Sequence, residues 1–66
     1  MKVQVNRTVV DIFDGAQSQH AVLRYLVHRR LAKSLLKTGR IQDAWGHDIG
    51  LDAPLHEGQI LKFKIK

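Results

Sequence analysis

Apolar and polar residues alternate at the beginning of the chain. Val3 and Val5 are separated by polar residues, the period-2 pattern of a strand with one buried face. Residues 8–13 are rich in β-branched and aromatic side chains, which favours a second strand. Between them, Asn6-Arg7 suits a two-residue turn because asparagine tolerates the left-handed conformation. The pattern therefore predicts an N-terminal β-hairpin.

Beyond Ser18, which is a candidate N-cap, apolar residues recur at the three- and four-residue intervals of a helix. The first set is Val22, Leu23, Leu26, Val27 and Leu31, and the second is Leu31, Ala32, Leu35 and Leu36. Gly39 is expected just after the last turn. The segment His28-Arg29-Arg30 interrupts the apolar stripe, so the sequence allows one helix bent near His28 or two short helices between Ser18 and Lys37.

The last third of the chain predicts further strands. Residues 41–45 suit a short strand, and glycines at turn spacing follow them. At the end, Leu61, Phe63 and Ile65 alternate with Lys62, Lys64 and Lys66. We therefore expect a single α+β domain over residues 1–66. It would contain an N-terminal β-hairpin, one helix that is straight, bent or split, short strands and a C-terminal strand in a mixed sheet.

Charge divides the chain into two parts. The formal net charge is +5, and the segment from Gly15 to Gln42 contains basic residues and no acidic ones. From Asp43 to Glu57 the sign reverses, with acidic residues and no lysine or arginine. A clustered positive charge raises the expectation of a polyanionic partner, such as RNA, DNA or an acidic protein surface.

The basic segment is the best candidate for a binding surface. If it is helical, Arg29, Lys33 and Lys37 lie four residues apart and share a face. The alternative is a solvated face that keeps a small protein soluble. Trp45 stands in a loop-like region where it could contact a partner, whereas Tyr25 lies close to the apolar stripe and is expected in the core. The predicted binding residues are Arg24, Arg29, Arg30, Lys33, Lys37, Arg40 and Trp45.

Several kinds of chemistry are not expected. The chain contains no cysteine, and its four histidines lack the short spacing of a zinc site. Neither a phosphate-binding glycine motif nor a positioned nucleophile is present. We therefore expect no catalytic residues, metal, cofactor or small-molecule substrate. No secretory signal and no apolar run of about 20 residues is found, which favours a cytoplasmic protein without a membrane partner.

Two short motifs resemble those of a known superfamily. Asp14-Gly15-Ala16 precedes the predicted helix, and Leu55-x-x-Gly58-x-Ile60 leads into the last strand. With the order of elements, they resemble the β-grasp, or ubiquitin-like, superfamily, particularly its sulfur-carrier and TGS branches. Gln59 stands where an aspartate is usual. The resemblance implies that the first and last strands pair in parallel at the centre of the sheet, with the helix across one face.

The same resemblance argues against carrier chemistry. Sulfur carriers of this superfamily are activated at a C-terminal Gly-Gly, whereas this chain ends in Lys64-Ile65-Lys66. A weaker resemblance links residues 31–41, Gly46 and the late Leu-x-x-Gly motif to the S4 RNA-binding domain. We therefore expect a non-catalytic interaction module that uses a basic helix face. An S4-like or TGS-like RNA-binding module and a degenerate sulfur-carrier-like protein are the alternatives.

Overall fold

A tight hairpin begins the fold. Strands β1 (Lys2–Val5) and β2 (Thr8–Asp11) pair antiparallel. The two residues between them, Asn6 and Arg7, have φ angles of 48° and 68°. Two left-handed residues make the type I′ turn, whose twist matches that of the paired strands. The predicted hairpin is confirmed, although β2 ends before residues 12 and 13.

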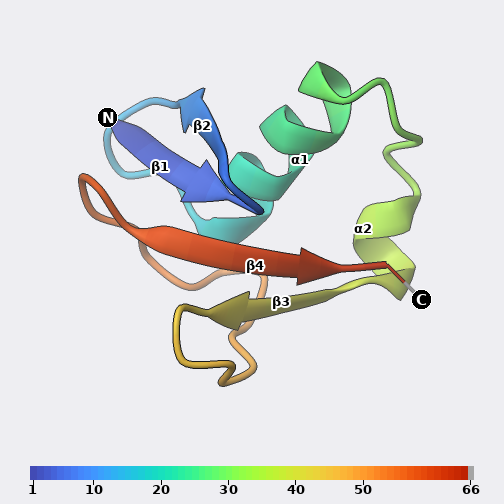
Figure 1. Cartoon of the computed structure of the whole chain (residues 1–66). Coiled ribbons are helices and arrows are strands. Elements are labelled where there is room, and N and C mark those ends of the chain that lie inside the picture. Colours follow the sequence, from blue (N-terminus) through green and yellow to red (C-terminus); the bar gives the residue numbers. More distant parts are fainter. Residues whose placement is uncertain (66) are drawn as a thin grey trace.

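The computed structural model describes residues 1–65 and shows an α+β chain with one mixed sheet (Figure 1). The strand order is β2-β1-β4-β3. Strand β4 (Ile60–Lys64) pairs in parallel with β1 and antiparallel with β3 (Arg40–Asp43). The first and last strands therefore meet at the centre of the sheet, as expected. Lys66, which was expected to continue the outward lysine row, lies outside the described residues.

The longer helix, α1 (Ser18–His28), packs against β1 and β2 and covers one face of the sheet (Figure 1). The buried core between them is Val3, Val5, Val10, Ile12, Ala16, Ala21, Val22, Tyr25, Leu26, Ile41, Leu61 and Phe63. Tyr25 is a core residue, as predicted. The opposite face, called the open face here, exposes the side chains of Lys2, Val9, Asp11, Arg40, Ile60, Lys62 and Lys64. In β4, the predicted alternation holds up to Lys64, but Ile65 is exposed.

The beginning of α1 differs from the prediction by one residue. The N-cap is Gln17, and its backbone N–H donates to Nδ1 of His20 at 2.8 Å. Ser18 is instead the first helical residue and is completely buried. Its hydroxyl donates to the carbonyl of Gly50, so it ties the helix to a distant loop. The sequence pattern could not reveal this bond because its two partners are far apart in the chain.

The predicted helical region is two helices. The N–H of Arg30 bonds to the carbonyl of Val27, and the N–H of Leu31 bonds to that of Leu26. These are the two bonds of a Schellman motif, in which Arg30, with a φ of 58°, occupies the position that glycine usually takes. The second helix, α2 (Leu35–Thr38), is one short turn.

Neither helix within residues 1–65 is long and apolar enough to cross a membrane.

Gly39 ends α2, as the sequence predicts, but not through a left-handed conformation. Its φ is −81°, which any residue can adopt. Glycine is needed here because of packing: the ring of Phe63 occupies the space that a Cβ atom at residue 39 would take.

Candidate binding surfaces

The basic residues expected on one helix face lie on separate segments. Arg24 is on α1, Lys37 is on α2, and Arg40 begins β3. Arg29 and Lys33 fall where the chain has left α1, so the four-residue spacing no longer places them on one face with Lys37. The premise of a continuous helical row is therefore wrong. All of the predicted basic residues are nevertheless exposed, and their contact with a partner stays a prediction.

Two of these cations line an apolar depression, called the α1 groove here. It has a volume of about 250 Å³ and is formed by Ile12, Phe13, His20, Leu23, Arg24, Val27 and Lys33. Phe13 and Val27 are 59% and 53% exposed. The Phe13 ring lies 5.1 Å from that of His20, at an interplanar angle of 60°. The groove thus exposes apolar side chains to solvent, and Arg24 and Lys33 add positive charge to its lining.

The groove exists because the apolar arc of α1 is wider than the sheet can cover. Val22 and Leu26 are completely buried, whereas Leu23 and Val27 form a second i, i+4 ridge toward solvent. The sequence pattern grouped all of them as one stripe. A helical projection would have shown the excess width, but only the folded chain shows that Phe13 extends the ridge.

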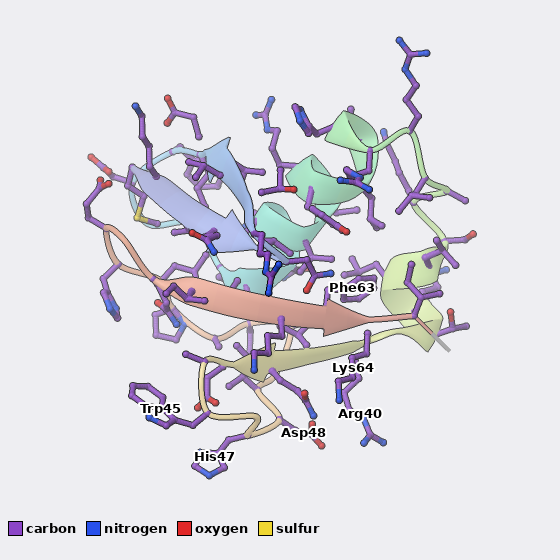
Figure 2. The ribbon with its side chains drawn as sticks, viewed as in Figure 1. Arg40, Trp45, His47, Asp48, Phe63 and Lys64 are labelled. Carbon is purple, nitrogen blue, oxygen red and sulfur yellow. The ribbon has the colours of Figure 1, made fainter. Side chains whose placement is uncertain are left out.

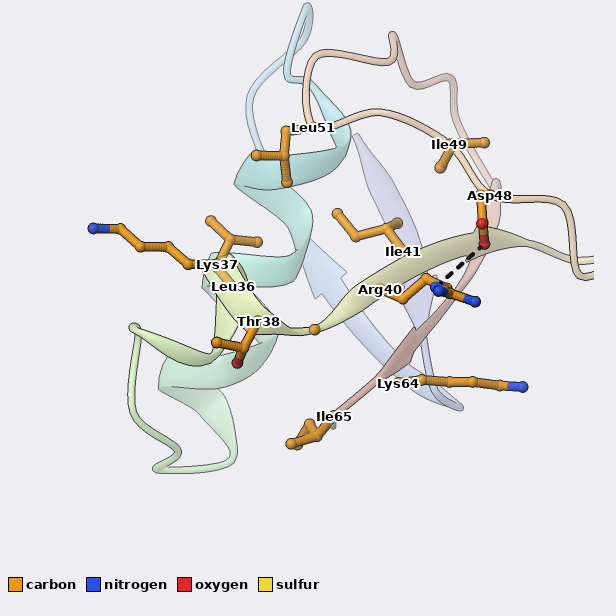
Figure 3. A pocket seen from close by; sticks show the side chains of 11 residues that line it. Leu36, Lys37, Thr38, Arg40, Ile41, Asp48, Ile49, Leu51, Lys64 and Ile65 are labelled. Atoms are coloured by element: carbon orange, nitrogen blue, oxygen red, sulfur yellow. Dashed lines mark ion pairs between the residues drawn. The ribbon is translucent and has the colours of Figure 1, made fainter.

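Lys37 and Arg40 line a second, larger depression, called the β3–β4 cleft here (Figure 3). Its volume is about 590 Å³, and Leu36, Ile49, Leu51 and Ile65 supply apolar walls. Arg40 and Lys64 stand directly opposite each other in the antiparallel pair, and the latter was not among the predicted site residues. Asp48 Oδ1 lies 3.9 Å from Arg40 Nε and offsets part of this charge. Arg29 and Arg30 line neither depression.

Trp45 stands on a turn that is held by one carboxylate. It is 82% exposed, and Figure 2 shows it at the opposite end of β3 from Arg40. Asp43 Oδ1 accepts hydrogen bonds from the backbone N–H groups of Trp45 and His47, both at 2.9 Å. Gly46, at a φ of 86°, completes the turn. The indole is thus presented to solvent on a defined backbone, which keeps it a candidate for partner contact.

This turn should open in acid. The hydrogen bond from the His47 backbone N–H, helped by that of Trp45, holds the pKa of Asp43 below its ordinary value, although desolvation opposes the shift. A carboxyl whose pKa is lowered by folding stabilises the turn above the pKa of the unfolded state, about 3.9. That contribution is lost as the pH falls through the lower, folded pKa. We expect the amide NMR signals of Trp45 and His47 to show an acid transition below about pH 4.

Asp43→Asn is the matched control for this titration. Its side-chain oxygen still accepts hydrogen bonds but does not titrate, so the two amide signals should lose their acid transition. The same transition in the variant would show that another group is responsible.

Within residues 1–65, no group of three or more histidine, cysteine, aspartate or glutamate side chains is placed to hold a metal ion. The two depressions are instead lined by apolar side chains and cations. Such linings can bind an anionic or amphipathic partner.

No family model, curated protein or solved structure matches the chain, so its resemblance to the β-grasp superfamily stays an expectation.

Proposed function

We propose that this protein is a non-catalytic binding module whose α1 groove receives an acidic segment of a protein partner. The observation that carries the proposal is the exposure of Phe13 and Val27 in a groove that Arg24 and Lys33 also line. Neither cation belongs to an ion pair within residues 1–65. The groove thus offers both apolar surface and uncompensated positive charge to a partner.

The two kinds of side chain would contribute differently. Full burial of a valine or phenylalanine side chain contributes about 1.5–3 kcal/mol. Phe13 and Val27 are each little more than half exposed, so burying the rest of both would contribute roughly 1.5–3 kcal/mol in total. Arg24 and Lys33 would select a partner of opposite charge and speed its approach. The partner segment is therefore expected to combine one or two apolar anchors with neighbouring aspartate or glutamate residues.

The fold supports a related proposal about ancestry. The parallel pair of β1 and β4 at the centre of the sheet, with α1 across one face, is the arrangement that the β-grasp resemblance implies. We propose that the protein is a β-grasp-like module. The proposed compartment is the cytoplasm, whose reducing conditions a chain without cysteine tolerates.

RNA is the second candidate partner. The observation that favours it is the position of Arg40, Lys62 and Lys64 on the open face, where Arg40 is opposite Lys64 and the two lysines lie two positions apart along β4. Trp45 lies beyond the other end of β3 (Figure 2). Cations can neutralise phosphates, and an exposed indole can stack on a base. This surface is distinct from the α1 groove, so variants can separate the two candidates.

A peptide selection tests the main proposal. Displayed random peptides selected on the wild-type protein should be enriched in acidic residues next to apolar ones. For a selected peptide, the double variant Arg24→Glu with Lys33→Glu should weaken binding by about tenfold or more, measured by fluorescence anisotropy. Phe13 and Val27 amide signals should shift on peptide binding.

The double variant Lys62→Glu with Lys64→Glu is the matched control. It makes the same change in net charge on the open face and should leave peptide affinity nearly unchanged. Peptides without acidic enrichment, or equal losses in both double variants, would contradict the groove. If RNA is the partner, a single-stranded RNA pool should instead bind in a salt-dependent way, and only the control variant should lose that binding.

A further inference from the structure

The backbone N–H of Ile41 points away from the sheet and has no acceptor. In an antiparallel pair such as β3 and β4, alternate residues bond to the partner strand and those between them face outward. The carbonyl of Ile41 accepts from the N–H of Ile49 at 3.0 Å, on the outer side of β3, so the N–H of Ile41 faces outward too. Within residues 1–65 this N–H donates to no backbone or side-chain acceptor. Ile41 is only 3% exposed, and an unpaired N–H in such a residue is rare.

This donor lies in the β3–β4 cleft. Ile41 lines the cleft, whose volume of about 590 Å³ is typical of sites for small organic ligands. Its apolar walls are incompletely covered by the chain: Leu51 and Ile65 are 45% and 48% exposed, and Leu36 and Ile49 are half-buried. A molecule with an apolar body would displace water from these walls, and a polar end could accept from Ile41.

The charges beside the donor favour an anion. Arg40 and Lys64 stand directly opposite each other in the sheet, and Figure 3 shows their side chains extending to the same side of the ribbon. Like charges in such a pair are destabilising. Asp48 offsets only part of the repulsion, because it lies 3.9 Å from Arg40 Nε, and Lys64 has no ion-pair partner within residues 1–65. An anionic group between the two cations would remove the repulsion.

We propose that the β3–β4 cleft binds a small amphipathic anion, a molecule with an apolar body and a carboxylate or phosphate head. The head lies between Arg40 and Lys64, and one of its oxygens accepts from the Ile41 N–H. The body lies against the apolar walls of the cleft. Lys37 has no part in holding the head, since its side chain extends in the opposite direction (Figure 3).

This inference goes beyond the proposed function, because the α1 groove and the β3–β4 cleft share no residue. Sequence patterns indicated no small ligand for a physical reason. The cleft is assembled from α2, β3, the loop after β3 and β4, which are separated along the chain. The free N–H of Ile41 depends on where that loop stops pairing with β3, and no local pattern specifies this point.

Titrations with octanoate and with octyl phosphate, followed by amide NMR, test the proposal. At least one of these probes should bind saturably, with a large shift of the Ile41 amide signal. Acetate has the anionic head without the body, and octyltrimethylammonium has the same alkyl chain with the opposite charge. Both should bind about tenfold or more weakly. Comparison of octanoate with octyl phosphate identifies the preferred head.

Two variants change the charge of the cleft in opposite directions. The double variant Arg40→Gln with Lys64→Gln should weaken binding of the anionic probe by about tenfold or more. Asp48→Asn removes the carboxylate that competes for Arg40, so it should tighten binding by about twofold or more. Arg29→Gln with Arg30→Gln is the matched control. It removes two positive charges from residues that line neither depression and should leave the affinity nearly unchanged.

The amide spectrum of each variant verifies its fold, and loss of folding cannot imitate the tighter binding of Asp48→Asn. Absence of saturable binding by both anions would overturn the proposal. So would equal affinity for octyltrimethylammonium or acetate, equal losses in the two double variants, or shifts confined to Phe13 and Val27, which would place the anion in the α1 groove. Failure of the peptide test would leave these results unaffected, so the two proposals fail separately.

Discussion

Replacing Asn6 with alanine is expected to lower the free energy of unfolding by about 2–4 kcal/mol. The Asn6 carboxamide takes the place of a further residue of β1 beside β4. Its Nδ2 donates to the carbonyl of Phe63 at 2.8 Å, and its Oδ1 accepts from the Phe63 N–H at 2.9 Å. Alanine would leave both partly buried backbone groups without these partners. A domain of this size has a net stability of roughly 3–10 kcal/mol, so the loss is a large share.

Urea unfolding followed by circular dichroism measures the effect. Asn6→Gly separates its two causes, because glycine adopts the φ of 48° without strain but also lacks the carboxamide. We expect stability to fall in the order wild type, glycine variant, alanine variant. A glycine variant as stable as wild type would show that the turn conformation, and not the bond to Phe63, makes Asn6 necessary.

The parts of the fold that follow from local patterns could be predicted. The alternation of Val3 and Val5 and that of Leu61 and Phe63 each specify a strand with one buried face, and both strands are present. The Asn6 turn was likewise indicated by the tolerance of asparagine for positive φ. The bond between Asn6 and Phe63 could not be predicted, because it depends on which strands become neighbours.

The predicted basic surface depended on where α1 ends, and this is where the prediction of a continuous row failed. Helix stop signals usually include glycine at the left-handed position. Here Arg30 adopts that conformation, so the interruption at His28-Arg29-Arg30 allowed a stop but no glycine marked it. Because α1 ends at this point, the cations are divided between two surfaces. Arg24 and Lys33 line the α1 groove, whereas Lys37 and Arg40 line the β3–β4 cleft.

The missed site residues have a related physical cause. The sequence pattern assigned Phe13 to a strand and Val27 to the core stripe of a helix. Each has an apolar side chain whose burial depends on how far the sheet extends beneath α1. The four-residue strand β2 ends before Phe13, which leaves both side chains at the groove. A sequence gives the chemistry of such residues but not the limit of the surface that covers them.

Replacing Gly39 with alanine is expected to lower the free energy of unfolding by about 1–3 kcal/mol, a fall in Tm of roughly 5–20 °C. An added Cβ would collide with the end of the Phe63 ring and would also lie 3.0 Å from the carbonyl of Leu35. Phe63 is only 3% exposed, so its ring cannot turn away without disturbing the core beneath α1.

Gly50→Ala is the matched control for Gly39→Ala. A Cβ at Gly50 would meet only Asp52 Oδ1, at 3.0 Å, and this atom ends an exposed side chain that can move. The control should change stability by less than about 1 kcal/mol, and it could gain from a less flexible unfolded chain. Equal losses in the two variants would indicate a general cost of removing glycine. A loss confined to Gly39 would show that the close contact between Gly39 and the Phe63 ring, which joins the end of α2 to β4, stabilises the fold.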